Sequence, residues 1–184
     1  RLDAPAADYV PELRAWKYPT EDTAPLRVRD LLNHVSGFVT DDPWGDRQQP
    51  LAEEDFTQML RAGVPFTSAP GTRMEYSNLG YALLGRIITN VSQRPYAETI
   101  ERTLLQPLGM ASSGFDVGKA PLERRALGYR WEDDAWRIEP TMGPGVFGAM
   151  GGLQTSASDY AKWVAYLLSA WPAGPSVATV LWTT

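Results

Sequence analysis

Tyr76 and Asn78 are the two residues of this chain whose types and spacing best suit chemistry. They stand between a Pro70-Gly71 turn and a long amphipathic stretch, so the sequence predicts that they lie at the entrance of a helix. The first backbone N–H groups of a helix lack partners, and the helix dipole favours negative charge there. Both effects would stabilise an anionic species at or near the tyrosine oxygen.

The composition limits the nucleophiles that could work beside this pair. The chain has no cysteine, which excludes thiolate catalysis, disulfides and cysteine metal sites, and its single histidine, His34, excludes a multi-histidine zinc site. Nucleophilic catalysis would therefore have to use Ser, Thr, Lys or a carboxylate. The sequence contains no Gly-x-Ser-x-Gly elbow, no phosphate-binding loop and no Ser-x-x-Lys. We expect neither a cofactor nor a metal, and interpret Asp41 and Asp42 as a solvated turn.

Size and charge indicate one soluble globular domain. The 184 residues suffice for one domain, and 43% hydrophobic with 21% charged residues is an ordinary globular balance. The net charge of -5 gives no electrostatic reason to expect a nucleic-acid partner. No apolar run reaches transmembrane length, so we expect no integral membrane segment. The oligomeric state is left open.

Apolar spacings and end signals predict the elements that must position the candidate residues. Five helices are expected, over residues 28–34, 52–62, 79–91, 95–105 and about 156–168. A hairpin is predicted from Gly128 to Trp131 and Ala135 to Ile138, and a short tail helix from Val177 to Trp182. Residues 1–25 are expected to be irregular and residues 111–126 to form a loop.

Two of these helices carry further signals. In the 79–91 helix, the small residues Gly80, Ala82 and Gly85 would permit close approach by a neighbouring element. Ser156 and Asp159 form a capping-box pattern at the start of the last helix. The apolar residues of that last helix are expected to face the core; they are Tyr160, Trp163, Val164, Leu167 and Leu168.

Four motifs in order resemble one family. They are Leu31-Leu32-Asn33-His34-Val35-Ser36-Gly37, Pro70-Gly71-Thr72 followed by Tyr76-Ser77-Asn78, Gln106-Pro107-Leu108-Gly109-Met110, and the run from Gly151 to Asp159. Together they resemble the class C β-lactamase superfamily, which also contains D-alanyl-D-alanine carboxypeptidases, D-aminopeptidases and lactamase-like esterases. The resemblance spans nearly the whole chain.

The resemblance implies an α+β fold of the β-lactamase/transpeptidase type. In that fold an antiparallel sheet is flanked by helices and joined by a helical subdomain. The present chain would supply mainly the helical region, a short hairpin and part of the lead-in to the sheet. Residues from about 26 to 110 would form the helical subdomain, and residues from about 120 to 184 would return toward the α/β region. The resemblance also favours a periplasmic or extracytoplasmic location.

The resemblance further implies a serine acyl-transfer enzyme acting on a small-molecule or peptide substrate. Its three motifs are Ser-x-x-Lys, Tyr-x-Asn and Lys- or His-x-Gly, and only the second is present. Tyr76 would be the general base and acid, and Asn78 would orient the substrate. Family order places the other two motifs before residue 1 and beyond residue 184, so the chain would be the middle of an enzyme. An unperturbed tyrosine titrates near ~10, so Tyr76 would need the family lysine as a neighbouring positive charge, since Arg73 is the only cation near it in sequence.

Gly151 departs from the class C pattern. It occupies the place where class C β-lactamases usually carry an aromatic wall to the acyl site, and a glycine there opens the pocket. This favours an esterase or peptidase relative over a dedicated cephalosporinase, with lactam, ester and D-amino-acid substrates all open.

Simpler interpretations stand beside these. The scaffold could belong to a non-catalytic binding protein, because the chain has no nucleophile motif. Tyr76 could be a partly buried tyrosine at a helix start, and Asn78 a helix cap. His34 is expected to be a structural hydrogen-bonding residue near a helix end, and Gly151 could serve the backbone alone. In a longer chain, a sheet would cover the apolar helix faces.

Overall fold

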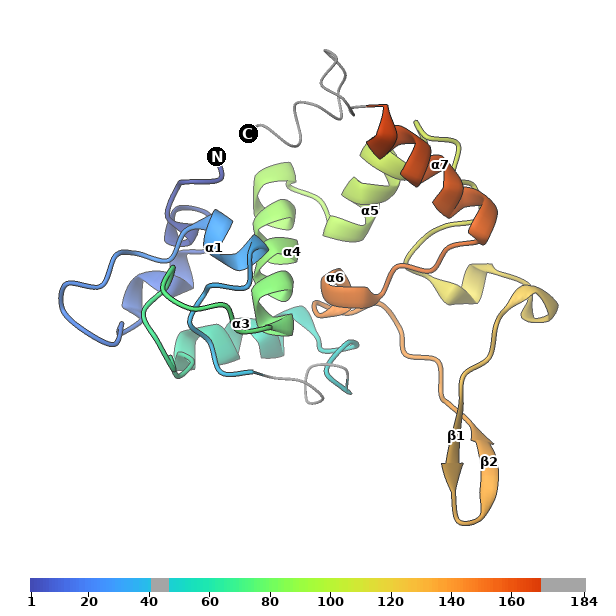
Figure 1. Ribbon diagram of the computed structural model, residues 1–184, viewed down its shortest axis with the longest axis horizontal. Helices are drawn as coiled ribbons and strands as arrows, with labels where there is room; N and C mark the ends of the chain where they lie inside the picture. The colour runs from blue at the N-terminus through green and yellow to red at the C-terminus, as the bar shows by residue number, and fades with distance from the viewer. Residues whose placement is uncertain (41–46, 170–184) are drawn as a thin grey trace.

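The computed structural model describes residues 1–40 and 47–169 as an α+β arrangement dominated by helices. The α-helices and β-strands whose bounds are described are α1 (Val28–Leu32), α3 (Glu53–Ala62), α4 (Asn78–Ser92), α5 (Tyr96–Ile100), β1 (Tyr129–Glu132), β2 (Ala135–Ile138), α6 (Gly148–Gly151) and α7 (Ala157–Leu168). Figure 1 shows α4 between α1 and α3 on one side and α5, α6 and α7 on the other. The predicted tail helix from Val177 to Trp182 lies outside the described residues, as do Asp41 and Asp42.

Helix α4 is the central element because its apolar face and its small residues are both used. Leu79, Leu83 and Ile87 are buried in one core cluster, as the 79–91 periodicity predicted, and Ala82 is buried with them. Val91, which the same periodicity also placed on the buried face, is exposed near the end of the helix. A methyl group added at Gly85 would lie 2.7 Å from the Cβ of Ala149, which is in α6. The expected close approach is therefore confirmed, and it brings α6 directly against α4.

The N-terminal segment completes this core without a long helix. Residues 1–25 are irregular apart from short 3₁₀ turns at Ala6–Asp8 and Pro11–Ala15. Trp16 from this segment is buried, packs edge-on against Phe38, and donates its indole N–H to the Leu60 carbonyl at 2.7 Å. The segment is thus held by an aromatic side chain with a satisfied polar group, which is a stable way to anchor an irregular chain.

Three predicted boundaries need correction. Helix α1 ends at Leu32, two residues early, because His34 adopts a left-handed φ of 55° that no helix can contain. The predicted 95–105 helix is an α-helix only over Tyr96–Ile100, and Glu101–Leu105 continues as a π-helix. The predicted 111–126 loop contains 3₁₀ turns at Val117–Lys119 and Leu122–Arg124.

The predicted hairpin is present and projects away from the helices (Figure 1). Its turn consists of Asp133 and Asp134, whereas the predicted strand ends left three residues for the turn. Both residues have positive φ, 51° and 55°, because a two-residue turn needs such angles to match the twist of the strands. Trp131 and Trp136 face each other across the strands with ring centroids 5.4 Å apart. Both indoles are exposed.

Helix α7 follows its predicted start, but only half of the capping box forms. The Ser156 hydroxyl accepts the N–H of Asp159 at 3.2 Å. The Asp159 carboxylate does not return that bond; it accepts from the Ser112 N–H at 2.7 Å and from Lys162 at 2.7 Å. It therefore ties α7 to the loop that follows α5.

The expected burial of the apolar face of α7 is wrong for three residues. Tyr160, Val164 and Leu168 are exposed. Their spacing marks a common face of the helix, but a periodic pattern does not say which segment covers that face. In residues 1–40 and 47–169, no element is packed over these side chains closely enough to bury them.

We expect Asp159 to make the stability of the chain depend on acid pH. The hydrogen bond from Lys162, together with those from Ser112 N–H and the Ser113 hydroxyl, holds the pKa of Asp159 below its ordinary value despite burial. A carboxylate with a lowered folded pKa stabilises the fold above its unfolded pKa, about 3.9, and loses that contribution as pH falls through the folded pKa.

Urea unfolding between pH 7 and pH 2 checks this expectation. The free energy of unfolding should fall less steeply below about pH 4 in Asp159→Asn than in the unchanged protein. Some dependence will remain in the variant, because Arg29 likewise lowers the pKa of Asp3. Glu123→Gln, at an exposed position, is the control and should keep the full slope. Equal slopes for Asp159→Asn and Glu123→Gln would contradict the assignment.

Candidate active site

The Tyr76-Ser77-Asn78 segment forms the entrance of α4, as predicted. Ser77 has extended backbone, with φ -143° and ψ 118°, and its hydroxyl accepts the N–H of Gly80 at 3.1 Å. Ser77 is therefore the N-cap, and the interpretation of Asn78 as the cap is wrong. Asn78 is the first helical residue, and Tyr76 immediately precedes the cap.

The three residues differ sharply in exposure. Tyr76 is 44% exposed, whereas Ser77 is 1% and Asn78 is 3% exposed. Because Ser77 has extended backbone, its side chain points to the opposite side from that of Tyr76, whereas Asn78 is buried as the first residue of α4. The phenol is accessible to a substrate, while the amide is held within the protein at the start of the helix.

Backbone bonds join this segment to the His34–Gly37 motif. The Glu75 N–H donates to the His34 carbonyl at 2.7 Å, and the Gly71 N–H donates to the Val35 carbonyl at 2.7 Å. The Thr67 N–H donates to the Gly37 carbonyl at 2.8 Å. Two sequence motifs about forty residues apart therefore lie side by side and support each other.

His34 contacts the candidate site directly. Its Nδ1 accepts the N–H of Ser77 at 3.2 Å. Its ring centroid lies 4.6 Å from that of Tyr76, at 30°, and 5.1 Å from that of Tyr81, at 25°. The expectation of a structural hydrogen-bonding histidine near a helix end is confirmed. The stacking on Tyr76 was not predicted.

Arg73 is engaged with a carboxylate. Its guanidinium lies 3.5 Å from Glu75, and Glu75 also accepts a hydrogen bond from the Thr67 hydroxyl at 2.8 Å. The Arg73 side chain is 68% exposed, so solvent screens its charge as well. The cation closest to Tyr76 in sequence is therefore a weak source of the positive charge that a phenolate needs.

Tyr96 shows what a purely structural tyrosine looks like in this fold. It is buried, and its hydroxyl donates to the Gly145 carbonyl at 3.1 Å. Burial, with a smaller contribution from the charge of Glu53, raises the pKa of Tyr96 to about 12. Such a tyrosine stays protonated at neutral pH and is unsuited to act as a base.

Gly151 lies at the exposed end of α6. A methyl group added there would meet nothing within 4 Å, so the backbone position is open. Helix α6 packs on α4 at Gly85, which is ~10 Å along the helix axis from Asn78 at 1.5 Å per residue. The structure therefore places Gly151 at the exposed end of the helix that packs on α4.

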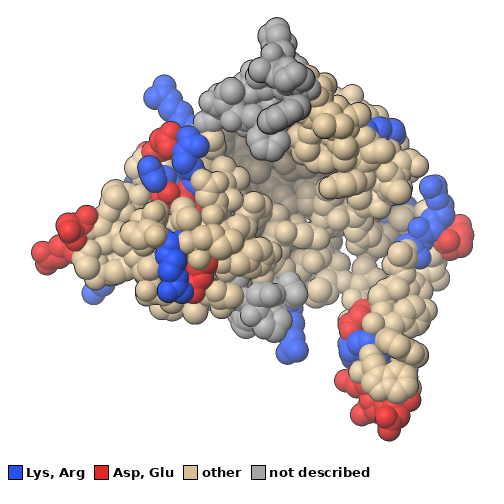
Figure 2. Space-filling view, in the orientation of Figure 1, with Lys and Arg blue, Asp and Glu red and all other residues tan. Residues whose placement is uncertain are grey.

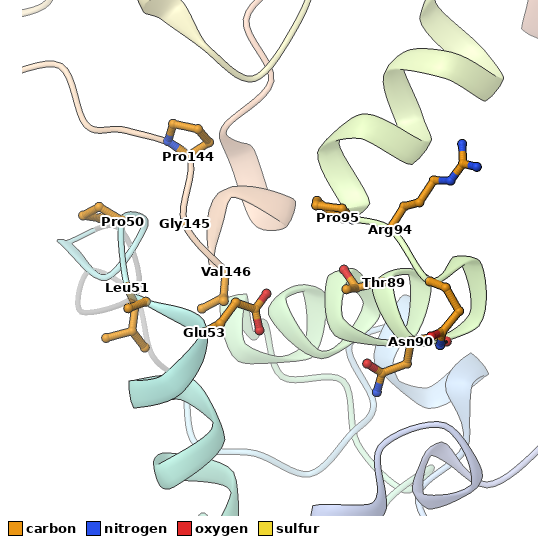
Figure 3. A pocket seen from close by; sticks show the side chains of 12 residues that line it. Pro50, Leu51, Glu53, Thr89, Asn90, Arg94, Pro95, Pro144, Gly145 and Val146 are labelled. Carbon is orange, nitrogen blue, oxygen red and sulfur yellow. Dashed lines mark hydrogen bonds between the residues drawn. The ribbon is translucent and has the colours of Figure 1, made fainter.

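A separate hollow of about 550 Å³ lies between the start of α3, the last turns of α4 and residues 144–146 (Figure 3). Three of its polar side chains already serve the fold. Asn90 donates to the Tyr9 carbonyl at 2.8 Å, Thr89 donates to the Gly85 carbonyl at 3.0 Å, and Glu53 pairs with Arg86 at 2.6 Å. Neither of the candidate residues of α4 and its entrance lines this hollow.

The charged side chains gather in no single-sign patch on the face in Figure 2, where basic and acidic groups are mixed over the helical body and the hairpin. Within residues 1–40 and 47–169, no group of three or more His, Cys, Asp or Glu side chains could hold a metal ion. The same part of the chain contains no helix long and apolar enough to cross a membrane.

Solved structures share this arrangement. A penicillin binding protein from Bacillus halodurans matches with a TM-score of 0.74 and 26% identity, covering 100% of this chain and 57% of that one. A class C β-lactamase in complex with cefoxitin matches with a TM-score of 0.73 and 28% identity, covering 94% of this chain and 45% of that one. The β-lactamase/transpeptidase-like fold expected from the motifs is thereby confirmed.

Two curated relatives extend the comparison. Protein Rv1367c of Mycobacterium tuberculosis is 30% identical over 167 residues, which is 82% of this chain and 41% of the relative. The D-alanyl-D-alanine-carboxypeptidase/endopeptidase AmpH of Escherichia coli is 24% identical over 174 residues, 92% of this chain and 43% of the relative. The chain thus spans less than half the length of these relatives. A sequence model of the Beta-lactamase family matches residues 1–179, and the chain belongs to that family.

Proposed function

We propose that the protein containing this chain is a serine hydrolase that cleaves an amide, lactam or ester bond through an acyl-enzyme. Tyr76 is its general base and acid, and Asn78 orients the substrate. The observation that carries the proposal is the Tyr-Ser-Asn segment at the entrance of α4, with an exposed phenol and a buried amide, in a chain of the Beta-lactamase family. The nucleophilic Ser-x-x-Lys would precede residue 1, and Lys- or His-x-Gly would follow residue 184.

The proposed steps assign each proton. The serine hydroxyl attacks the carbonyl carbon of the substrate and passes its proton to the Tyr76 phenolate. Tyr76 then donates that proton to the leaving nitrogen or oxygen as the scissile bond breaks, which leaves the acyl-serine. In the second half, a water molecule attacks the acyl carbon while Tyr76 takes its proton. The bond from the acyl carbon to the serine oxygen then breaks, Tyr76 returns the proton to that oxygen, and the carboxylic acid product leaves. The lysine of Ser-x-x-Lys supplies the positive charge that favours the phenolate.

Gly151 supports a substrate preference within this class. The space around its Cα is open, so no side chain of that residue would limit the acyl portion of a substrate. We therefore propose an esterase or peptidase rather than a dedicated cephalosporinase. Within the whole protein, residues from about 26 to 110 would form the helical subdomain, and residues from about 120 onward would lead back to the α/β region.

Covalent labelling tests the proposed function. Full-length protein incubated with a fluorescent penicillin or a fluorophosphonate should carry label that survives denaturing electrophoresis, because both reagents acylate or phosphonylate an activated serine. Heat-denatured protein is the control and should stay unlabelled. The 184-residue chain alone should also stay unlabelled, since it lacks Ser-x-x-Lys. Labelling of that chain, or failure of both reagents on the full-length protein, would contradict the proposal.

A non-catalytic binding protein on the same scaffold is the second candidate. It applies if the whole protein carries no Ser-x-x-Lys. The coding sequence upstream of residue 1 separates the two, because a Ser-x-x-Lys there supports the enzyme and its absence supports the binding protein.

A further inference from the structure

We propose that His34 is a positioning residue that fixes Tyr76 in its catalytic orientation, stacking on the phenol and accepting a hydrogen bond beside it. The inference rests on the proposed function of Tyr76. His34 is not assigned contact with the substrate; it acts through the residue that it holds. Its backbone contacts, its ring contacts and its tautomer each support this role.

His34 holds the backbone on both sides of Tyr76. Its carbonyl accepts the N–H of Glu75 at 2.7 Å, and its Nδ1 accepts the N–H of Ser77 at 3.2 Å. The residue before Tyr76 and the residue after it are thus bonded to the same partner. The left-handed φ of 55° at His34 lets one residue present both acceptors to this segment.

The imidazole also limits where the phenol can go. Tyr76 is 44% exposed, so burial alone does not fix its rotamer. Its ring lies 4.6 Å from the His34 ring, and the Tyr81 ring lies 5.1 Å from the same imidazole. Tyr81 is anchored in turn, because it sits in the first turns of α4 and its hydroxyl donates to the Leu32 carbonyl at 3.4 Å. The stack therefore connects the exposed phenol to α4 and to the end of α1.

The geometry requires one form of the ring. Nδ1 can accept the Ser77 N–H only when it carries no proton, so the ring proton is assigned to Nε2. His34 in this form has no proton to give at Nδ1, which agrees with a holding role. Displacement of a catalytic group by about 1 Å can lower the reaction rate on the order of 100-fold, so a Tyr76 side chain that is not held in place would catalyse the reaction more slowly.

Kinetics of variants in the full-length protein test the inference. We expect His34→Ala to lower kcat by about 10- to 100-fold with KM changed less than about twofold, because the phenol is misplaced while the substrate site remains. His34→Asn should restore part of the loss. Its Oδ1 can take the place of Nδ1, and asparagine tolerates the left-handed backbone, but it cannot stack as an imidazole does. Asn33→Ala, at the exposed neighbouring position, should leave both constants unchanged.

A double variant separates positioning from a general structural effect. If His34 acts through Tyr76, adding His34→Ala to Tyr76→Phe should cause little further loss of kcat. An equal loss in both backgrounds would overturn the inference, as would an unchanged kcat in folded His34→Ala. If His34→Ala does not fold, the same cycle is run with His34→Asn. A wild-type kcat in Tyr76→Phe alone would instead refute the proposed function, and the two failures are thereby distinguished.

Discussion

Replacing Tyr76 by Phe in the full-length protein is expected to lower kcat for ester or peptide hydrolysis by about 10²- to 10⁴-fold, the usual contribution of a general acid–base group. The change removes only the hydroxyl oxygen. The phenyl ring can still stack on His34, whose ring lies 4.6 Å away, so the α4 entrance should keep its shape. Initial rates with an ester and with a D-amino-acid peptide measure the loss.

Tyr96→Phe is the matched control for this experiment. It makes the same chemical change at a buried tyrosine whose hydroxyl donates to the Gly145 carbonyl. We expect it to lower the free energy of unfolding by about 1 kcal/mol for the lost hydrogen bond and to leave kcat unchanged. Tyr76→Phe should show the opposite result, with a large loss of rate and little loss of stability. An unchanged rate in Tyr76→Phe would remove the proposed role.

The elements around the site could largely be predicted because their signals are local. Periodic apolar residues located α4, and signals at the helix ends located α3, which was expected over residues 52–62. The close contact at Gly85 followed from its small size in an otherwise apolar helix. Such features depend on residues within one or two helical turns of each other, so they can be predicted from a short stretch of sequence.

Features that depend on distant partners could not be predicted. Ser77 and Asn78 are both good capping residues, and only the backbone conformation decides that Ser77 is the cap. The stacking of His34 on Tyr76 joins residues that no local pattern relates. The exposure of Tyr160 could not be predicted either, because the sequence shows that a helix has an apolar face but not which segment packs against that face.

The chemistry of the site could be predicted only from the four motifs taken together. The residues alone predicted a tyrosine at a helix entrance, where many tyrosines are merely structural. The order of four motifs implied the acyl-transfer role, and the family match over residues 1–179 supports the class. The exposed phenol of Tyr76 agrees with that role but does not by itself identify a substrate.

A methyl group added at Gly37 should strongly destabilise the fold around the site. Its φ is 77°, and a Cβ built there would lie 2.1 Å from the Ser68 carbonyl oxygen. Backbone, unlike the end of a flexible side chain, cannot move away cheaply. We expect Gly37→Ala to lower the free energy of unfolding by about 3 kcal/mol, of which about 1 reflects the positive φ and the rest the forced displacement.

Gly109→Ala isolates the contribution of the clash. Gly109 has a similar φ of 68°, but an added methyl group would meet nothing within 4 Å, so only the loss of about 1 kcal/mol is expected. Urea unfolding of both full-length variants measures the difference, and equal losses would contradict the explanation.

The displacement at Gly37 should also reach the site. Gly37 accepts the N–H of Thr67, whose hydroxyl in turn donates to Glu75, and Glu75 is bonded to His34. Gly37→Ala should therefore lower kcat as well as stability, whereas Gly109→Ala should leave kcat unchanged.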